Sequence, residues 1–159
     1  MNDNQRTLSY TQKIKGTPRE IFPLLCPERE CDWLDGWDYE MIHSQSGFAE
    51  GNCVFKTPMH GKNDTYWVVS RYDPENFIIE FVRFTLPEVI VQIAIQVLGS
   101  ASDFTDVRVS YTYTALSRAQ LEYLKNQLED DFEDSMSWWE KSMNYYLEMG
   151  EMLKRDEQR

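Results

Sequence analysis

The stretch SRAQLEYLKNQLEDDFEDSMSWWEKSMNYYLEMGEML, residues 117–153, has the pattern that decides the fold. Its apolar residues recur at intervals of three or four positions, with one longer interval, which is the spacing of a single stripe along an α-helix. One long amphipathic helix is therefore predicted, and its apolar side needs a surface to cover. The stripe is rich in Trp, Tyr and Met, which suits a cavity wall at least as well as a close-packed core. It consists of Leu121, Leu124, Leu128, Phe132, Met136, Trp139, Met143, Tyr146 and Leu153.

Four segments ahead of this helix alternate with a period of two, as strands with one buried face do. Apolar or aromatic residues stand at odd-numbered positions, and polar residues such as Glu80, Gln92 and Arg108 stand at even-numbered ones. The links are short and contain turn-forming residues, so the strands are predicted to pair as successive antiparallel hairpins. The inward positions are Thr65, Trp67, Val69, Phe77, Ile79, Phe81, Val89, Val91, Ile93, Ile95, Val97, Val107, Val109, Tyr111 and Tyr113.

The N-terminal part of the chain adds three strands and two short helices. Thr17 followed by Pro18 is typical of a helix start, because Thr caps the first turn and Pro fits the first helical position. The predicted elements are a first strand ending near Gly16, helices at 18–25 and 28–33, and short strands at 39–42 and 53–57. The predicted fold class is α+β, with a seven-stranded curved antiparallel sheet wrapped around the long C-terminal helix and two short helices between the first two strands.

Composition indicates a single soluble domain. The chain has 159 residues, of which 42% are hydrophobic and 27% are charged, and it contains no apolar run long enough to span a bilayer. A formal net charge of -11 argues against nucleic acid and anionic membranes as partners, because these are bound through Lys and Arg. The first residues lack a secretory signal, and the cysteine count is odd. We therefore expect a cytoplasmic protein with free thiols.

The order of these elements resembles the helix-grip fold of START and Bet v 1-like proteins. The segments TPREIFPLLCP at 17–27 and DWLDGW at 32–37 resemble the opening of bacterial proteins of the polyketide cyclase and dehydrase branch of the SRPBCC superfamily. The segments WVVSRYDP at 67–74, EFVRF at 80–84, YTYTALS at 111–117 and WWE at 138–140 are similar to later parts of the same proteins. The resemblance implies one START/Bet v 1-like ligand-binding domain over residues 1–159, with a deep cavity between sheet and helix. The resemblance carries no catalytic motif. It also implies no single function, because the superfamily includes lipid carriers, hormone-binding proteins, cyclases and chaperone activators.

Arg83 is the main polar candidate for a site. It has the same parity as Ile79 and Phe81, so it is predicted to point toward the apolar face, where a charge must be paired or must bind something. A guanidinium in a cavity holds a carboxylate or carbonyl oxygen well. The alternative is that Arg83 lies near the strand end and reaches solvent or Glu88. His60, in a glycine-flanked turn, is a second candidate, with an exposed loop position as its alternative.

Metal and nucleotide sites are not predicted. Cys26 and Cys31 are separated by four intervening residues rather than two, and no second pair has structural-zinc spacing. No glycine-rich phosphate loop and no nucleophile elbow occurs. The acidic group Glu129, Asp130, Asp131, Glu133 and Asp134 is interpreted as the solvated outer side of the long helix.

Three functions fit the sequence. The leading hypothesis is binding of a small hydrophobic or aromatic molecule in the cavity, by a monomer or weak dimer that needs no cofactor. The first alternative is an enzyme like the polyketide cyclases and dehydratases, in which Arg83, His60 or a tyrosine hydroxyl stabilises an enolate. The second is a partner-binding module that uses the acidic surface. Trp33 and Trp37 either lie over the mouth of the cavity or fill the end of the core. The predicted ligand-binding residues are Trp33, Trp37, Phe55, His60, Trp67, Phe81, Arg83, Ile93, Tyr111, Tyr113, Trp139 and Met143.

Overall fold

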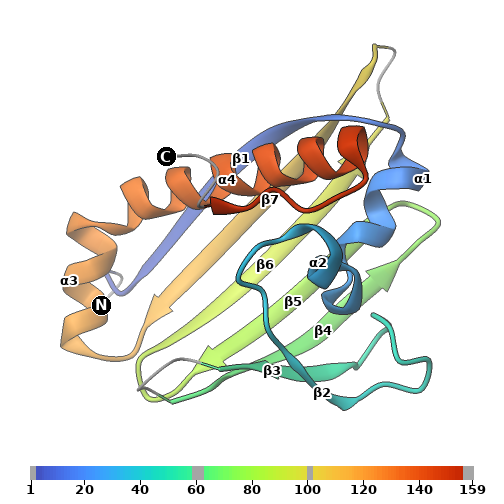
Figure 1. Ribbon diagram of the computed structural model, residues 1–159. Coiled ribbons are helices and arrows are strands. Elements are labelled where there is room, and N and C mark those ends of the chain that lie inside the picture. Colours follow the sequence, from blue (N-terminus) through green and yellow to red (C-terminus); the bar gives the residue numbers. More distant parts are fainter. Residues whose placement is uncertain (1–2, 59–62, 100–101, 156–159) are drawn as a thin grey trace.

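The computed structural model describes residues 3–58, 63–99 and 102–155. One curved sheet carries the helices on a single face (Figure 1). The elements are β1 (Gln5–Lys15), α1 (Pro18–Ile21), the 3-10 helix η1 (Phe22–Leu25), α2 (Pro27–Trp33), β2 (Glu40–His43), β3 (Val54–Thr57), β4 (Thr65–Asp73), β5 (Ile78–Thr85), β6 (Val89–Leu98), β7 (Phe104–Ala115), α3 (Arg118–Asn126) and α4 (Leu128–Met149).

The predicted seven-stranded antiparallel sheet is confirmed. Its strand order is β1-β7-β6-β5-β4-β3-β2, so the hairpins from β2 to β7 form a meander and β1 closes the far side against β7. The β1–β7 pair runs without interruption from the Gln5–Thr114 pair to the Lys15–Phe104 pair. The first strand of the chain is thereby held next to the last, and the sheet curves around α4 (Figure 1).

The long C-terminal helix is present, but its predicted bounds from Ser117 to Leu153 are wrong. The segment forms two helices, α3 and α4, which meet at Gln127, where φ is -132° and ψ is -27°. Only one residue separates the helices, so the spacing of the apolar stripe continues across the break and gives no sign of it. Gly150 then ends α4 in the left-handed conformation. Leu153 lies beyond the helix and forms an isolated parallel bridge with Leu34.

The start of the short helical segment follows the prediction from Thr17 and Pro18. The Glu20 amide donates to the Thr17 hydroxyl at 3.3 Å, and the Thr17 amide donates to the Glu20 carboxylate at 3.0 Å, which makes a complete capping box. The predicted helix at 18–25 divides into α1 and a 3-10 turn. After α1 and this turn the chain enters α2, which lies over the same face of the sheet as α4 (Figure 1).

The close-packed core occupies only part of the space between sheet and helix. Ile14, Val107, Val109 and Met143 are completely buried where α4 crosses the β1–β7 side of the sheet. The predicted inward parity of β4 to β7 is confirmed by the buried side chains along those strands. The buried Gln12 on β1 donates through Nε2 to the Met136 carbonyl at 3.2 Å and ties this strand to α4. The space over β3, β4 and β5 is filled less completely, and the candidate site lies there.

Candidate functional site between sheet and helices

Arg83 stands in the middle of a row of paired residues that crosses five strands. Phe55 pairs with Trp67, Trp67 with Arg83, Arg83 with Val91, and Val91 with Tyr113. Residues directly opposite one another in a sheet share a face, so all five side chains belong to the concave side. The parity of β5 therefore places a guanidinium among aromatic neighbours, on the side of the sheet that the helices cover.

The guanidinium of Arg83 lies between two aromatic rings. Its Cζ is 5.3 Å from the centre of the Trp67 ring and 5.6 Å from the centre of the Tyr111 ring, both within the range of cation–π attraction. Within the described part of the chain, no carboxylate forms an ion pair with Arg83. The aromatic faces thus stabilise the charge without neutralising it.

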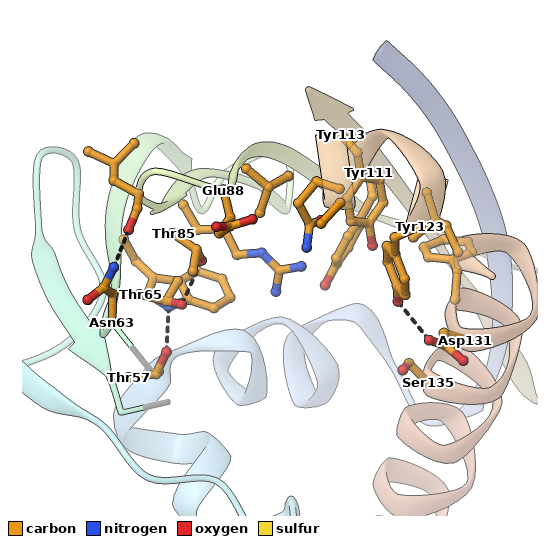
Figure 2. A pocket seen from close by; sticks show the side chains of 18 of the residues that line it. Thr57, Asn63, Thr65, Thr85, Glu88, Tyr111, Tyr113, Tyr123, Asp131 and Ser135 are labelled. Atoms are coloured by element: carbon orange, nitrogen blue, oxygen red, sulfur yellow. Dashed lines mark hydrogen bonds between the residues drawn. The ribbon is translucent and has the colours of Figure 1, made fainter. Parts of the chain in front are cut away.

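Arg83 separates two neighbouring chambers that share Trp67, Arg83 and Tyr111 as lining residues. The outer chamber has a volume of about 780 Å³ and lies between the sheet, α3 and the first turns of α4. Figure 2 shows its polar side chains facing one another across the opening. Its lining consists of Thr57, Asn63, Thr65, Trp67, Arg83, Thr85, Leu86, Glu88, Val89, Tyr111, Tyr113, Ala119, Gln120, Tyr123, Leu128, Asp131, Phe132, Ser135 and Met136.

Hydrogen bonds fix the polar side chains on both sides of the outer chamber. The Tyr123 hydroxyl of α3 donates to Asp131 of α4 at 2.7 Å, across the break between the two helices (Figure 2). On the sheet side, the hydroxyls of Thr65 and Thr85 are 2.7 Å apart. Asp131 was expected on the solvated side of the helix, but it lines the chamber and accepts the hydrogen bond from Tyr123.

The tyrosines of the outer chamber stay protonated at neutral pH. Burial raises the pKa of Tyr111 and of Tyr113, and the nearby charge of Arg83 opposes both shifts. Burial also raises the pKa of Tyr123, and its hydrogen bond to Asp131 adds to the shift. The chamber therefore offers neutral hydroxyl groups next to one unpaired guanidinium.

The inner chamber is smaller and mostly apolar. It has a volume of about 170 Å³ and lies between the sheet, α2 and α4. Trp33 and Trp139 stack with their ring centres 6.2 Å apart on one side, and Phe55 and Trp67 stack at 5.4 Å on the other. The lining consists of Glu30, Trp33, Leu34, Trp37, Phe55, Trp67, Phe81, Arg83, Ile93, Ile95, Tyr111 and Trp139.

Glu30 on α2 is the acidic side chain of this inner chamber. Burial raises the pKa of its carboxyl well above the usual range. The side chain retains some accessible surface because it faces the chamber. Among the described residues, the Glu30 carboxyl has no hydrogen-bond or ion-pair partner. This shift favours the protonated form of the carboxyl, which can donate a hydrogen bond.

Two hydrogen bonds fix the tryptophans at the end of α2. The indole nitrogen of Trp33 donates to the Leu24 carbonyl at 2.9 Å, and that of Trp37 donates to the Pro27 carbonyl at 2.9 Å. Trp33 is fully buried, whereas Trp37 is partly exposed and stands edge-on to Phe55 and Trp67. Both residues line the inner chamber, and Trp33 also belongs to the core.

The structure brings together most of the residues predicted to bind a ligand. Met143 is an exception, because it is completely buried one turn beyond Trp139 and lines neither chamber. Helical periodicity correctly gives its face of α4, but it does not show where along the helix the cavity ends. His60 lies outside the described residues. The residues that line one chamber or both are Trp33, Trp37, Phe55, Trp67, Phe81, Arg83, Ile93, Tyr111, Tyr113 and Trp139.

Several polar residues of the site were not predicted from the sequence. Glu30 had a usable signal, since it precedes Trp33 by three positions and Leu34 by four, which places it on the same side of a helix. Tyr123 and Asp131 had none, because their contact depends on the break between α3 and α4.

No group of three or more potential metal-ligating side chains occurs in the described ranges. In the same part of the chain, no helix has the length and apolar character needed to cross a membrane.

Solved structures show the same fold at low sequence identity. The chain is similar to the Zhui aromatase/cyclase from Streptomyces sp. R1128, with a TM-score of 0.69 and 10% identity over 94% of this chain and 99% of that one. Norcoclaurine synthase from Thalictrum flavum, in complex with dopamine and hydroxybenzaldehyde, has a TM-score of 0.65 and 13% identity over 90% of this chain and 86% of that one. A hypothetical protein from Helicobacter pylori has a TM-score of 0.71 and 12% identity over 89% of this chain and 87% of that one.

These likenesses confirm the Bet v 1-like helix-grip fold that the sequence resemblance implied. No protein-family model matches the sequence, and a search of curated proteins finds no significant match. The function of the chain must therefore be argued from its own site.

Proposed function

We propose that this helix-grip protein binds a small, largely apolar or aromatic molecule in its two chambers, with Arg83 holding an anionic or carbonyl oxygen of that molecule. The single observation that carries the proposal is the unpaired guanidinium at the boundary of a wide polar chamber and a narrow aromatic one. An apolar pocket with a few convergent polar groups is typical of small-molecule sites, and the aromatic chamber beside Arg83 has this character.

The energetics of Arg83 favour a ligand over a purely structural role. A buried charge is costly unless it is paired, and the faces of Trp67 and Tyr111 compensate only partly for lost hydration. A carboxylate or carbonyl oxygen would complete the coordination through charge-assisted hydrogen bonds. The neutral tyrosine hydroxyls nearby could orient the same group, since they can donate as well as accept.

The direct experiment is native mass spectrometry of the purified protein, to find a co-purifying molecule, followed by titration with an environment-sensitive anionic dye. The parent is expected to bind the dye, and Arg83→Met is expected to weaken binding about ten- to a hundredfold, as loss of a charge-assisted contact does. Arg71→Met is the control, because Arg71 is exposed on β4 and pairs with Glu80 at 3.2 Å. A parent protein that binds no dye and carries no small molecule would contradict the proposal.

A second candidate function, an enzyme like the cyclases and dehydratases, is favoured by the polar groups of the outer chamber. Tyr111, Tyr113 and Tyr123 present hydroxyls in the same chamber as Arg83, and Asp131 supplies a carboxylate. A guanidinium can stabilise a developing enolate, and hydroxyls can donate to it. The aromatase/cyclase among the similar structures is compatible with this reading.

Incubation with polyketide-like thioesters separates the two functions. An enzyme would convert the thioester to a cyclised or dehydrated product, and Tyr111→Phe would lower kcat more than affinity, whereas a carrier would release the thioester unchanged. Mass analysis of the products decides between these outcomes.

A further inference from the structure

The inner chamber contains an acidic group that ligand binding through Arg83 does not use. Glu30 reaches the chamber from α2, where its lining neighbours include Trp33, Trp37 and Trp139. None of the described residues forms a hydrogen bond or an ion pair with its carboxyl. A polar group enclosed by aromatic side chains and left without a partner is unfavourable unless something else satisfies it.

We infer that Glu30 is a specificity-determining hydrogen-bond donor, and that the inner chamber takes a single aromatic ring whose substituent is a neutral acceptor such as a carbonyl oxygen. This inference rests on the proposed function, because it names the part of the ligand that enters the inner chamber. It assigns the two polar groups to different parts of one molecule. Arg83 holds a group at the chamber boundary, and Glu30 recognises the buried end.

The size of the chamber limits its occupant to one ring. An apolar cavity of about 150 Å³ binds benzene, and the inner chamber has a volume of about 170 Å³. A single ring with a small substituent fits this volume. The aromatic walls formed by Trp33, Trp139, Phe55 and Trp67 favour a ring, because aromatic pairs gain from stacked and edge-to-face contacts.

The charges around Glu30 favour a neutral acceptor over a cation. The titratable groups that line the chamber with it are Arg83 on β5 and Tyr111 on β7. A cationic ligand end would meet the positive guanidinium within the same small space. Burial raises the pKa of Glu30 and of Tyr111, and both shifts favour the neutral forms that donate a hydrogen bond. An anionic end would be attracted to the Arg83 guanidinium at the chamber boundary rather than to Glu30.

The test compares two probes of nearly equal shape, acetophenone and ethylbenzene, of which only acetophenone has an acceptor. Affinities are measured by calorimetric titration of the full chain near neutral pH, for the parent and for Glu30→Gln and Glu30→Met. The amide of Glu30→Gln keeps a donor, so the affinity ratio of acetophenone to ethylbenzene should change less than about twofold. Glu30→Met removes the donor, so the ratio should fall about three- to tenfold through weaker acetophenone binding alone.

A pH titration provides a second measurement that does not require Glu30→Met to fold. As the pH rises through the raised pKa of Glu30, the parent should lose affinity for acetophenone, because the ionised carboxylate no longer donates a hydrogen bond. Ethylbenzene binding should change less, and acetophenone binding to Glu30→Gln should stay flat.

The outcomes separate this inference from the proposed function. If the anionic dye binds but the ratio of the two probes is the same in all three proteins, the donor role of Glu30 is overturned and cavity binding stands. Dye binding without binding of either probe overturns the single-ring assignment. If neither the dye nor the probes bind, the proposed function and this inference both fail.

Discussion

Arg83 and Trp67 are directly opposite each other in the β4–β5 pair, and the Cζ of Arg83 is 5.3 Å from the centre of the Trp67 ring. The charge is therefore positioned by sheet register rather than by a carboxylate. This relationship distinguishes a guanidinium kept for a ligand from one that holds the fold together, because breaking a buried ion pair leaves its partner charge uncompensated.

Arg83→Met is expected to change the free energy of unfolding by less than about 2 kcal/mol. The variant loses cation–π contacts and a hydrogen bond with Tyr113 but breaks no ion pair, and methionine fills much of the space. Urea unfolding monitored by circular dichroism measures this. Arg83→Lys is the companion variant, as it keeps a charge in the same position. A loss above about 3 kcal/mol would indicate a structural pair and remove the main support for ligand recognition by Arg83.

Trp33 and Trp139 form a stacked pair with unequal surroundings, and they should respond differently to truncation. Trp33 is fully buried and hydrogen-bonded, so Trp33→Ala should cost about 3 to 5 kcal/mol. Trp139 borders the inner chamber and its indole nitrogen is buried without a partner among the described residues, so Trp139→Ala should cost only about 1 to 2 kcal/mol. If Trp139→Ala also costs about 3 to 5 kcal/mol, Trp139 is part of the close-packed core.

The sequence predicts the fold well because the sheet signals are local and repeated. The parity of β4 to β7, the Thr17 cap and the apolar stripe of the C-terminal segment each specify their element independently. The break at Gln127 is invisible in the stripe, because a one-residue interruption between two helices preserves the three- and four-residue spacing.

The site is predicted less completely, since parity gives the face of a residue but not its neighbours. Arg83 is found from its position on β5, whereas its place between Trp67 and Tyr111 depends on the register of three strand pairs. Helical periodicity likewise gives the inner face of α4 but not the point along it at which the cavity ends. Trp139 lines the inner chamber, while Met143, one turn further on, is in the core.

The three cysteines provide a simple measure of burial. All are free; Cys31 is exposed, whereas Cys26 and Cys53 are buried. We expect one thiol to react with an aromatic disulfide reagent in the folded protein and all three to react after unfolding, without prior reduction. Burial and the nearby carboxylates of Glu28 and Asp32 raise the pKa of Cys31, so its reaction should accelerate as the pH rises.

Cys31→Ser is the control for that assignment, and it should abolish the reaction of the folded protein. Rapid labelling of Cys26 or Cys53 in this variant would show that the α2 side of the molecule opens in solution.

Glu30 should give the stability of the protein a specific dependence on pH. Its pKa is raised well above 4.5 in the folded state by burial, so between the two values the folded protein holds a proton that the unfolded chain has released. Stability must then fall as pH rises, by at most about 1.4 kcal/mol per pH unit, and level off above the folded pKa. Below 4.5 both states are protonated, and the effect vanishes.

Glu30→Gln cannot titrate at this position. As the pH rises, this variant should therefore become more stable relative to the parent, as measured by the difference between their unfolding free energies. Glu148→Gln, at an exposed position on α4, should show no such trend. A parent and a Glu30→Gln variant with parallel pH profiles would mean that Glu30 is ionised in the folded protein, and that it cannot serve as a donor in the inner chamber.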